Sequence, residues 1–395
     1  MSALSPNKIV LGITGGIAAY KSAELVRLLI KQNIEVQVVM TAAACQFITP
    51  TTLQALSGKP VLTDLWAADQ GNGMSHINLA RWADALLVAP ASANFMTKLA
   101  HGAADDLLST LCLARGQCPL LVAPAMNVEM WQNPATQRNV AQMQGDGIVL
   151  LGPDSGDQAC GETGPGRMLE PADLLEDLLA ELSPKPLAGK KLLITVGATF
   201  EPLDAVRGLT NLSSGKMGMA VARAARAMGA EVTLVCGITT VPPPRGVKTL
   251  NAPSAQQMLE TVLDHIQEQD VFVSVAAVAD YTVTHPATQK IKKAAESLTL
   301  ELQPTQDILA TVAALPSPPF CVGFAAESEN LLTYAEEKRK HKKLPLLAAN
   351  LIQDGFGGDT NSLVLLDDQG SHPLPAGSKI DLAHQLLQHV ATMLA

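Results

Sequence analysis

The sequence predicts an α/β fold with two doubly wound domains, each built on a parallel sheet. Short apolar runs alternate with helical patterns from one end of the chain to the other, as they do where helices wind around parallel strands. These runs are apolar at nearly every position, which is typical of strands buried on both faces. At roughly 150 residues per domain, 395 residues provide for about two to three domains.

In the first half, the run KIVLGIT at residues 8–14 predicts the first strand. Two glycines follow it, and a helical pattern then continues to Lys31. Four more apolar runs follow, with helical patterns between them. The expected strands of this half are residues 8–14, 34–40, 84–90, 119–124 and 148–152.

The second half opens with a similar run, KKLLITVG, and alternates in the same way. Its expected strands are residues 190–197, 231–237, 246–251, 270–278, 298–303, 319–325, 345–350 and 362–366. Its expected helices lie near residues 214–229, 254–269, 306–314, 330–343 and 379–394. Between the halves, the proline-containing segment SPKPLAG is typical of a linker. We therefore predict domains at residues 1–183 and 190–395, joined by a linker at 184–189.

The composition excludes several classes of protein. Apolar residues make up 47% and charged residues 16%, which argues against disorder. Aromatic residues make up 3% and the net charge is −9, so a nucleic-acid binder is not expected, although local basic pockets remain open. No apolar run reaches the roughly 18 residues of a membrane span, and no signal peptide is apparent. The six cysteines form no CxxC pair, so we expect neither a zinc site nor disulfides, but a reduced, cytoplasmic protein.

Ligands of doubly wound sheets bind at the carboxyl ends of strands, so the motifs there are the candidate sites. Gly15 and Gly16 follow the first strand and open a helix. Such a turn suits a phosphate at a helix N-terminus, but it also suits a plain tight turn. It lacks the spacing of the GxGxxG dinucleotide fingerprint. The segments ASAN (91–94) and APAMN (123–127) follow two later strands, and their small residues and amides favour a binding site for a flat ring.

Two further residues of the first half carry reactive groups. His76 precedes a helical stretch, where a lone histidine is either structural or catalytic. Cys160 lies in the polar, glycine-rich segment 154–167, which could be a plain surface loop or a mobile lid. A cysteine in so polar a segment departs from the usual buried cysteine, which favours the lid, with Cys160 as proton donor and Arg167 as anion ligand.

In the second half, NLSSGKMG (211–218) looks like a P-loop but fails its test. Met217 stands where Ser or Thr would bind magnesium, although a phosphate site at the helix N-terminus stays open. Asp280 ends a strand, and Lys290 follows in a loop. Lys338 and Lys342 lie four residues apart on one helix face, where they are either solvated or converge on a polyphosphate that itself holds Mg²⁺.

These motifs together resemble one family over essentially the whole chain, the bacterial bifunctional phosphopantothenoylcysteine decarboxylase/phosphopantothenate–cysteine ligases. The matching segments are GGIAAYK, the His76 segment, APAMN, ACGETGPGRM, NLSSGKMG, AAVADY, KIKK, GFAAE and the KRKHKK helix. The resemblance implies a flavodoxin-like, FMN-dependent decarboxylase in the first half and a Rossmann-like, CTP-dependent ligase in the second. The substrates implied are 4′-phosphopantothenate, cysteine and CTP, with Mg²⁺ held mainly by the CTP phosphates.

For the decarboxylase, the resemblance implies that His76 is the base of the first step, that Asn127 binds the substrate carboxylate and that Cys160 protonates the enethiol intermediate. The FMN-binding residues it implies are Gly15, Gly16, Thr41, Ser92, Asn94 and Met126. The residues implied to hold the substrate around Cys160 are Ala159, Gly161 and Arg167.

For the ligase, the resemblance implies that Asn211 contacts an acyl-cytidylate intermediate and that Lys290 is catalytic. Lysines suit this role because they offset the charge of the triphosphate and of the departing pyrophosphate. The implied CTP-binding residues are Ser274, Val275, Ala276, Asp280, Lys290, Gln306, Asp307, Ile308, Leu309, Phe324, Lys338 and Lys342.

The chain departs from the family pattern at a few positions, which leaves the fine positioning of substrates open. Asp105 stands where Asn is expected, and Gly208 replaces a bulkier residue. Ala198, Phe200 and Gln306 replace Pro, Arg and Pro. Two other classes of protein are possible alternatives: a nicotinamide dehydrogenase, which the glycine spacing opposes, and a non-enzymatic regulatory subunit, which the presence of His76 and Cys160 opposes. The resemblance also implies a homo-oligomer, a dodecamer built from trimers and dimers.

Overall fold

The computed structural model describes residues 7–66, 74–292, 298–355 and 358–395. Lys293, the last residue of the KIKK motif, lies outside the described residues. The chain forms two compact units, Met1–Ser183 and Pro184–Ala395. In the part of the chain that is described, no helix has the length and apolar character needed to cross a membrane.

The N-terminal unit is built on a five-stranded parallel sheet with the strand order β2-β1-β3-β4-β5. Its strands are β1 (Lys8–Ile13), β2 (Glu35–Met40), β3 (Ala85–Ala91), β4 (Leu120–Pro124) and β5 (Val149–Leu150). The order reverses between β1 and β3, so the loops after these two strands flank the crevice where such sheets bind ligands.

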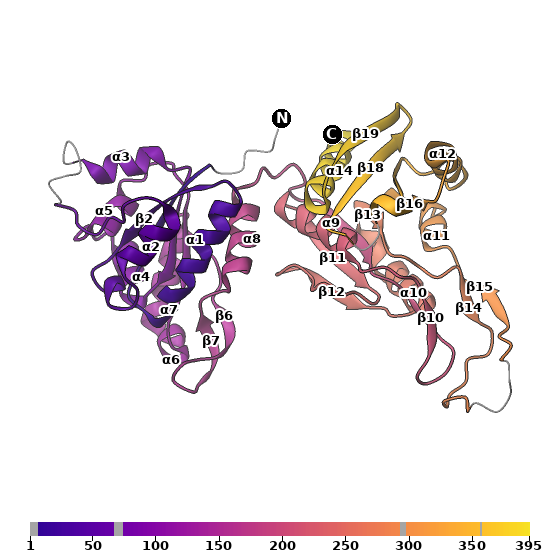
Figure 1. Ribbon diagram of the computed structural model, residues 1–395, viewed down its shortest axis with the longest axis horizontal. Coiled ribbons are helices and arrows are strands. Elements are labelled where there is room, and N and C mark those ends of the chain that lie inside the picture. Colours follow the sequence, from indigo (N-terminus) through magenta and orange to yellow (C-terminus); the bar gives the residue numbers. More distant parts are fainter. Residues whose placement is uncertain (1–6, 67–73, 293–297, 356–357) are drawn as a thin grey trace. The chain divides into compact units, whose positions relative to one another are not determined.

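Helices cover both faces of this sheet (Figure 1). Ile9 and Leu11 of β1 face α1 (Lys21–Lys31), α2 (Pro50–Ser57) and α8 (Pro171–Leu182). Val10, between them, faces α4 (Ala93–His101), α5 (Leu107–Leu113) and α7 (Pro134–Gly145). The alternation explains why the strand is apolar throughout, since each fully buried Leu or Ile contributes roughly 1.5–3 kcal/mol.

Short elements complete this unit: the 3-10 helices η1 (Ile17–Tyr20) and η2 (Ala44–Gln46), α3 (Ser75–Trp82), α6 (Val128–Gln132), β6 (Asp154–Asp157) and β7 (Thr163–Arg167). The segment around Cys160, expected to be a glycine-rich loop, is an antiparallel hairpin of β6 and β7. Strand propensity does not predict this hairpin, because the segment is rich in glycine and glycine is depleted in strands.

The C-terminal unit has an eight-stranded sheet with the order β12-β11-β8-β13-β16-β17-β18-β19. Its strands are β8 (Lys191–Val196), β11 (Glu231–Cys236), β12 (Lys248–Asn251), β13 (Val271–Ser274), β16 (Phe320–Glu327), β17 (Leu346–Leu351), β18 (Thr360–Asp367) and β19 (Gly370–Ser378). The sheet is parallel as far as β17, and the β18–β19 hairpin adds two antiparallel strands.

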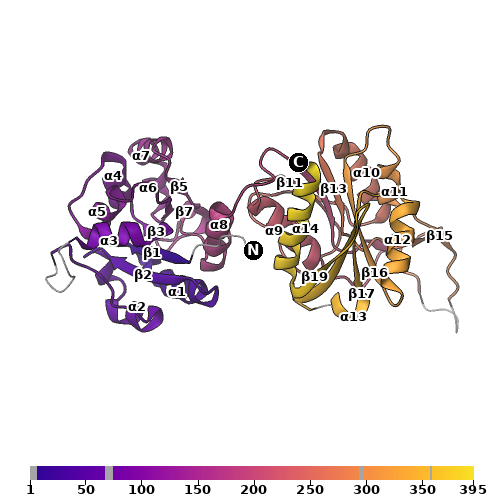
Figure 2. The same cartoon turned by 90° about the horizontal axis from the view of Figure 1, so that it is seen from above.

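Helices cover both faces of this sheet too (Figure 2). One face packs on α9 (Lys216–Ala227) and α14 (Lys379–Leu394), and the other on α10 (Ala255–His265), α11 (Ile308–Ala313) and α12 (Leu331–His341). The smaller elements are η3 (Ile266–Glu268), α13 (Ile352–Gly355) and the hairpins β9 (Phe200–Pro202) with β10 (Gly208–Thr210) and β14 (Tyr281–Val283) with β15 (Leu302–Pro304).

The α/β prediction with two wound sheets is confirmed. Most predicted strands and helices differ from the observed ones by one to three residues at an end. Two predictions need correction: the run 270–278 is a strand only to Ser274, and the run 298–303 joins the separate β14–β15 hairpin, not the main sheet. The apolar residues after Ser274 line a loop at the carboxyl edge, which periodicity alone does not distinguish from a strand.

Candidate functional sites

The loops at the carboxyl ends of β1, β2 and β3 hold one another in place. The hydroxyl of Thr14 donates to Pro90 O at 2.8 Å and accepts a hydrogen bond from the Ser92 backbone N–H at 2.9 Å. The Thr41 backbone N–H donates to Ile13 O at 3.0 Å. The structure thus gathers the predicted residues after these three strands at one edge, with Ser92 also capping α4.

The glycine turn at Gly15 and Gly16 has the backbone N–H groups that a bound phosphate would need. Among the described residues, no group accepts a hydrogen bond from the backbone N–H of Gly15 or Gly16. Unpaired N–H groups at the start of a helical segment are what an anion requires. Ile17 and Tyr20, just beyond the turn, are 67% and 61% exposed, so the turn lies beside uncovered apolar surface.

Asn127 and Cys160 meet at the tip of the β6–β7 hairpin. The Asn127 Nδ2 group lies 3.2 Å from Cys160 Sγ and 3.4 Å from Gln158 Oε1, and it also contacts the Glu162 carboxylate. Its Oδ1 accepts a hydrogen bond from the Glu129 N–H at 2.8 Å, which fixes the amide at the N-terminus of α6. The thiol is exposed, so a substrate can reach the pair.

The hairpin reaches Asn127 because its backbone packs directly on the APAMN segment. The Met126 N–H donates to Gly166 O at 2.9 Å, and a Cβ at position 166 would overlap Met126 O. Gly166 also has a φ of 133°, which only glycine adopts readily. Gln158 adds a second anchor, since its Oε1 accepts the Val128 N–H at 2.9 Å. Predicted clamp residues Ala159 and Gly161 lie beside Cys160 at the exposed tip.

Arg167 ends β7 and is already paired. Its guanidinium lies 3.2 Å from Glu170 Oε1. The same carboxylate oxygen lies 2.7 Å from the ammonium of Lys21, which is buried and also donates to Met168 O. An anion that binds Arg167 would therefore have to share it with Glu170.

His76 does not join Asn127 and Cys160 within one chain. It lies at the start of α3, and α3 runs toward the amino end of β3, where Lys8 Nζ lies 5.8 Å from the Trp82 ring. Asn127 instead follows the carboxyl end of β4. Figure 1 shows α3 at one end of the unit and β6 and β7 at the other. The His76 Nδ1 atom is buried and has no hydrogen-bond partner among the residues the structure describes.

In the C-terminal unit, Asn211 is tied to the segment after β13. Its Nδ2 donates to Ala277 O at 3.2 Å and to Val278 O at 3.1 Å. This segment contains the predicted CTP-binding residues Ser274, Val275 and Ala276, and the Ala276 N–H donates to Thr195 Oγ1 at 3.3 Å. The structure thereby brings the two predicted parts of the ligase site together.

The two helix lysines face a cluster of carboxylates. Lys342 Nζ forms an ion pair with Asp307, whose Oδ1 also caps α11. Burial raises the pKa of the Asp307 carboxyl, but the Ala310 N–H and Lys342 outweigh burial and leave the pKa below its usual range. Burial lowers the pKa of the Lys338 ammonium, and the charge of Lys342 lowers it further.

Asp280 also acts on Lys338. The carboxylates of Glu327, Asp307 and Asp280 raise the pKa of the Lys338 ammonium, but burial lowers it by more. Charged groups of three predicted segments, around Asp280, Asp307 and Lys338, therefore interact electrostatically here.

Lys290 is exposed, and hydrogen bonds of Asp204 and Arg207 with the neighbouring Ile291 fix its loop. Asp204 is buried, and its Oδ2 accepts hydrogen bonds from the Arg207 guanidinium at 2.6 Å and the Ile291 N–H at 3.1 Å. The hydrogen bond from Arg207 holds the pKa of the Asp204 carboxyl well below its usual range. Arg207 also donates to Ile291 O at 2.8 Å, so this pair fixes the residue next to Lys290.

The remaining predicted binding residues range from buried in the core to exposed at the surface. The side chains of Ile308 and Leu309 are buried in the core, so these residues offer a ligand only their backbone. Phe324 is half-buried in β16, whereas Asn94 and Gln306 are exposed.

Two departures from the family pattern lie in contact with each other. Phe200 of β9 and Gly208 of β10 belong to one hairpin, and a Cβ at position 208 would overlap the Phe200 ring. The same Cβ would also overlap the backbone oxygen of Glu201, so a bulkier residue at 208 is incompatible with both the Phe200 ring and the backbone of β9 in this conformation. Asp105 is explained separately, since its carboxylate lies 2.7 Å from Lys98 Nζ.

Sequence reasoning missed Gln158, Glu162 and Asp204. Gln158 and Glu162 lie two residues before and two residues after Cys160 in the segment 154–167. Their closeness to Cys160 in the sequence could have indicated that they belong to the site. Asp204 gave none, because its importance comes from a partner 87 residues away.

Comparison with known proteins decides the family. The model of the family described as "Flavoprotein" matches residues 2–183, and that described as "DNA/pantothenate metabolism flavoprotein C-terminal domain" matches residues 187–394. The coenzyme A biosynthesis bifunctional protein CoaBC of Vibrio vulnificus (strain YJ016) is 46% identical over 400 residues, covering 100% of both chains. The chain belongs to the CoaBC family.

Further relatives in other organisms carry the same name. The proteins of the same name from Escherichia coli (strain K12) and Bacillus subtilis (strain 168) are 45% and 40% identical, each covering 98% or more of both chains. Among solved structures, the C-terminal domain of a CoaBC is 38% identical, with a TM-score of 0.47, and covers 53% of this chain and 98% of its own. The FMN-dependent cysteine decarboxylase SpaF is 34% identical, with a TM-score of 0.40, and covers 46% and 99%.

The chain is therefore a bifunctional enzyme of coenzyme A biosynthesis, a phosphopantothenoylcysteine decarboxylase and phosphopantothenate–cysteine ligase. Its first half is a flavoprotein, and the predicted FMN cofactor is supported by this match. The alternatives of a nicotinamide dehydrogenase and of a purely regulatory protein are excluded by the family.

Proposed function

We propose that residues 190–395 ligate cysteine to 4′-phosphopantothenate with CTP, and that residues 1–183 decarboxylate the product to 4′-phosphopantetheine with FMN. The two compact units and the two family matches support this division. For the decarboxylase, the observation that carries the proposal is the 3.2 Å approach of Asn127 Nδ2 to Cys160 Sγ on an exposed hairpin.

In the decarboxylase, each residue has a distinct task. His76 accepts the proton of the substrate thiol. FMN, once bound, would supply the redox chemistry of the reaction. Asn127 donates a hydrogen bond to the substrate carboxylate before CO₂ departs, and Cys160 protonates the enethiol carbon. The amide and the thiol act on adjacent substrate atoms, which their contact allows.

The FMN site fits the glycine turn. The free N–H groups of Gly15 and Gly16 would hold the phosphate. The gathered loops that contain Thr41, Ser92 and Asn94, with Met126 of the APAMN segment, would line the ring. The exposed Ile17 and Tyr20 side chains offer apolar surface beside it.

A complete decarboxylase site requires a second copy of the chain. His76 belongs to α3, and Figure 1 shows α3 at the opposite end of the unit from the hairpin of β6 and β7. A neighbouring copy would bring its α3 to the hairpin, which agrees with the proposed assembly into trimers and, through the ligase half, a dodecamer. A symmetric ring of copies repeats such a contact at every site.

In the ligase, the substrate carboxylate attacks the α-phosphate of CTP and pyrophosphate leaves. The amine of cysteine then attacks the acyl carbon, and CMP leaves. Lys338, Lys342 and Lys290 would offset the charge of the triphosphate, which also holds the Mg²⁺. Asn211 would hold the acyl-cytidylate, and the residues after β13 would line the nucleotide. The ion pair of Lys342 with Asp307, and the effect of Asp280 and Asp307 on Lys338, support this site.

The reaction is tested by coupled turnover of 4′-phosphopantothenate, CTP and cysteine, with CMP and CO₂ detected separately. We expect CMP formation to require all three substrates, and CO₂ formation to require the product of ligation. CO₂ release without any CMP, from these substrates alone, would contradict the order. We place both reactions in the cytoplasm.

A further inference from the structure

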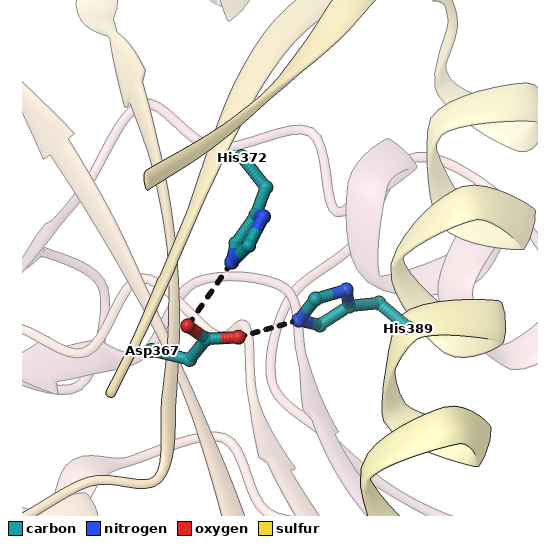
Figure 3. Close-up of side chains that lie close together, drawn as sticks. All are labelled: Asp367, His372 and His389. Atoms are coloured by element: carbon teal, nitrogen blue, oxygen red, sulfur yellow. Dashed lines mark hydrogen bonds and ion pairs between the residues drawn. The ribbon is translucent and has the colours of Figure 1, made fainter. Parts of the chain in front are cut away.

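One carboxylate and two imidazoles meet far from the predicted active-site residues in the sequence. Asp367 ends β18, His372 lies in β19 and His389 lies in α14. The two carboxylate oxygens of Asp367 lie 3.0 Å from His372 Nε2 and 2.8 Å from His389 Nε2. Figure 3 shows both rings pointing these nitrogens at the carboxylate from different elements.

The carboxylate is fixed independently of the histidines. Asp367 is 5% exposed, and its Oδ1 also accepts the backbone N–H groups of Gln369 and Gly370 at 2.8 and 3.1 Å. Such outer hydrogen bonds orient a metal ligand and hold its geometry. The neighbouring Asp368 turns to Arg339, 2.8 Å away, so it does not compete for the site.

We propose that Asp367, His372 and His389 bind one Zn²⁺ ion. Their donor atoms, one oxygen and two imidazole nitrogens, all lie within 4.8 Å of one another. Two imidazoles and one carboxylate form a common three-ligand zinc set, in which a water occupies the fourth position. Softer metals would call for thiolates, and hard Mg²⁺ or Ca²⁺ would call for more oxygens than the cluster provides.

The rearrangement that zinc requires is small. Zinc bonds of about 2.0–2.1 Å in tetrahedral geometry place the donor atoms about 3.3 Å apart. The carboxylate–imidazole pairs are already at 2.8 and 3.0 Å, so they open slightly while the two rings approach each other. Their centroids lie 4.9 Å apart, and the His372 side chain is 36% exposed, which leaves it room to turn.

Zinc binding changes where the imidazole protons lie. A carboxylate only accepts hydrogen bonds, so in the metal-free cluster each imidazole donates its Nε2–H to Asp367. On binding, each Nε2 gives its lone pair to the metal, and the proton is carried on Nδ1 instead. The exposed side of His372 gives the ion a path of entry and lets water complete the coordination.

The alternative explanation is that the three side chains bind no metal and only stabilise the packing of the β18–β19 hairpin on α14 through their hydrogen bonds. The two explanations differ for Asp367→Asn, which keeps the shape and can still accept a hydrogen bond but loses the charge that zinc requires. His389→Gln and His372→Gln remove one nitrogen ligand each. His384→Gln serves as the matched control, since His384 lies in the same helix as His389 but outside the cluster.

The test uses the untagged full-length chain, stripped with a chelator and titrated with Zn²⁺ against a competing chelator. We expect one high-affinity Zn²⁺ per chain in the wild type and in His384→Gln, and at least a tenfold weaker affinity in each of the three cluster variants. A Cys160→Ser background excludes binding at the exposed thiol. Zinc should also raise the melting temperature of the wild type but not that of Asp367→Asn. No stoichiometric zinc, or equal affinity in wild type and cluster variants that remain folded by circular dichroism, would overturn the proposal.

Discussion

The side-chain amide of Asn127 and the thiol of Cys160 lie 3.2 Å apart, although 33 residues separate them in the chain. The contact exists because the β6–β7 hairpin packs its glycine backbone against Met126. It places a group suited to bind a carboxylate beside a group suited to deliver a proton. Our predictions for the decarboxylase follow from this pair.

Replacing Cys160 by Ser should separate decarboxylation from the final protonation. The variant should bind FMN and release CO₂ but stop at the oxidised enethiol, because the hydroxyl is a far weaker acid than the thiol. Mass spectrometry of the product and trapping of CO₂ measure the two outcomes. Cys118→Ser, which changes a half-buried thiol elsewhere, is the control. Normal 4′-phosphopantetheine formation at the wild-type rate by Cys160→Ser would show that Cys160 is not the proton donor.

His76→Asn should retain FMN but show no loss of flavin absorbance when substrate is added, because the first proton transfer fails. If the site lies between copies, mixing by co-expression of His76→Asn with Cys160→Ser should restore activity. Random assembly pairs an intact His76 with an intact Cys160 in about a quarter of sites, so roughly a quarter of wild-type activity is expected. No recovery in mixed oligomers would place both residues in one chain's site.

Gln158→Ala should weaken the hold of the hairpin on Asn127. Gln158 Oε1 accepts the Val128 N–H at 2.9 Å, and its Nε2 donates to Pro165 O at 3.3 Å. Losing bonds worth about 0.5–1.5 kcal/mol each should lower decarboxylase kcat roughly tenfold and leave ligation unchanged. Gln142→Ala, on the surface of α7, is the matched control. Equal decarboxylase rates for both variants would argue against a positioning role for Gln158.

Lys290 and Asn211 should divide the ligase reaction. Lys290→Gln should make little acyl-cytidylate, with a rate loss of about 10²–10³, because it removes a positive charge where negative charge develops. Asn211→Asp should form the intermediate but process it poorly, so the intermediate accumulates. Mass spectrometry of reactions with and without cysteine distinguishes the two. Accumulation in Lys290→Gln and none in Asn211→Asp would reverse the two roles.

The affinity for CTP should fall with rising pH because of Lys338. Burial, then Lys342, lowers its pKa below the ordinary lysine value. Lys338 is charged below that pKa and loses its attraction for the triphosphate as the pH rises through it. We expect KM for CTP to rise about 10- to 100-fold across this range, the equivalent of one charged hydrogen bond. Lys338→Arg should flatten the rise, whereas Lys340→Arg, on the exposed side of the same helix, should not. An unchanged profile in Lys338→Arg would assign the titration elsewhere.

Local pattern was enough to predict the elements and the edge where the sites lie. The run KIVLGIT is apolar throughout because β1 is covered on both faces, and that cause is visible in the sequence itself. The loops after β1 and β3 could likewise be placed at one edge, since parallel strands end on the same side. The β6–β7 hairpin was missed because glycine carries no strand signal.

The two wound sheets, their order of elements and the motifs at the strand ends follow from the order of residues, because they depend on the periodicity and chemistry of neighbouring residues. Which side chains meet depends on the folded chain. It joined Asn127 to Cys160, separated both from His76, tied Asp204 to Ile291 and gathered Asp367 with two histidines. The physical reason is that hydrogen bonds and ion pairs act over a few ångströms in space, whereas these partners lie up to 87 residues apart in the chain.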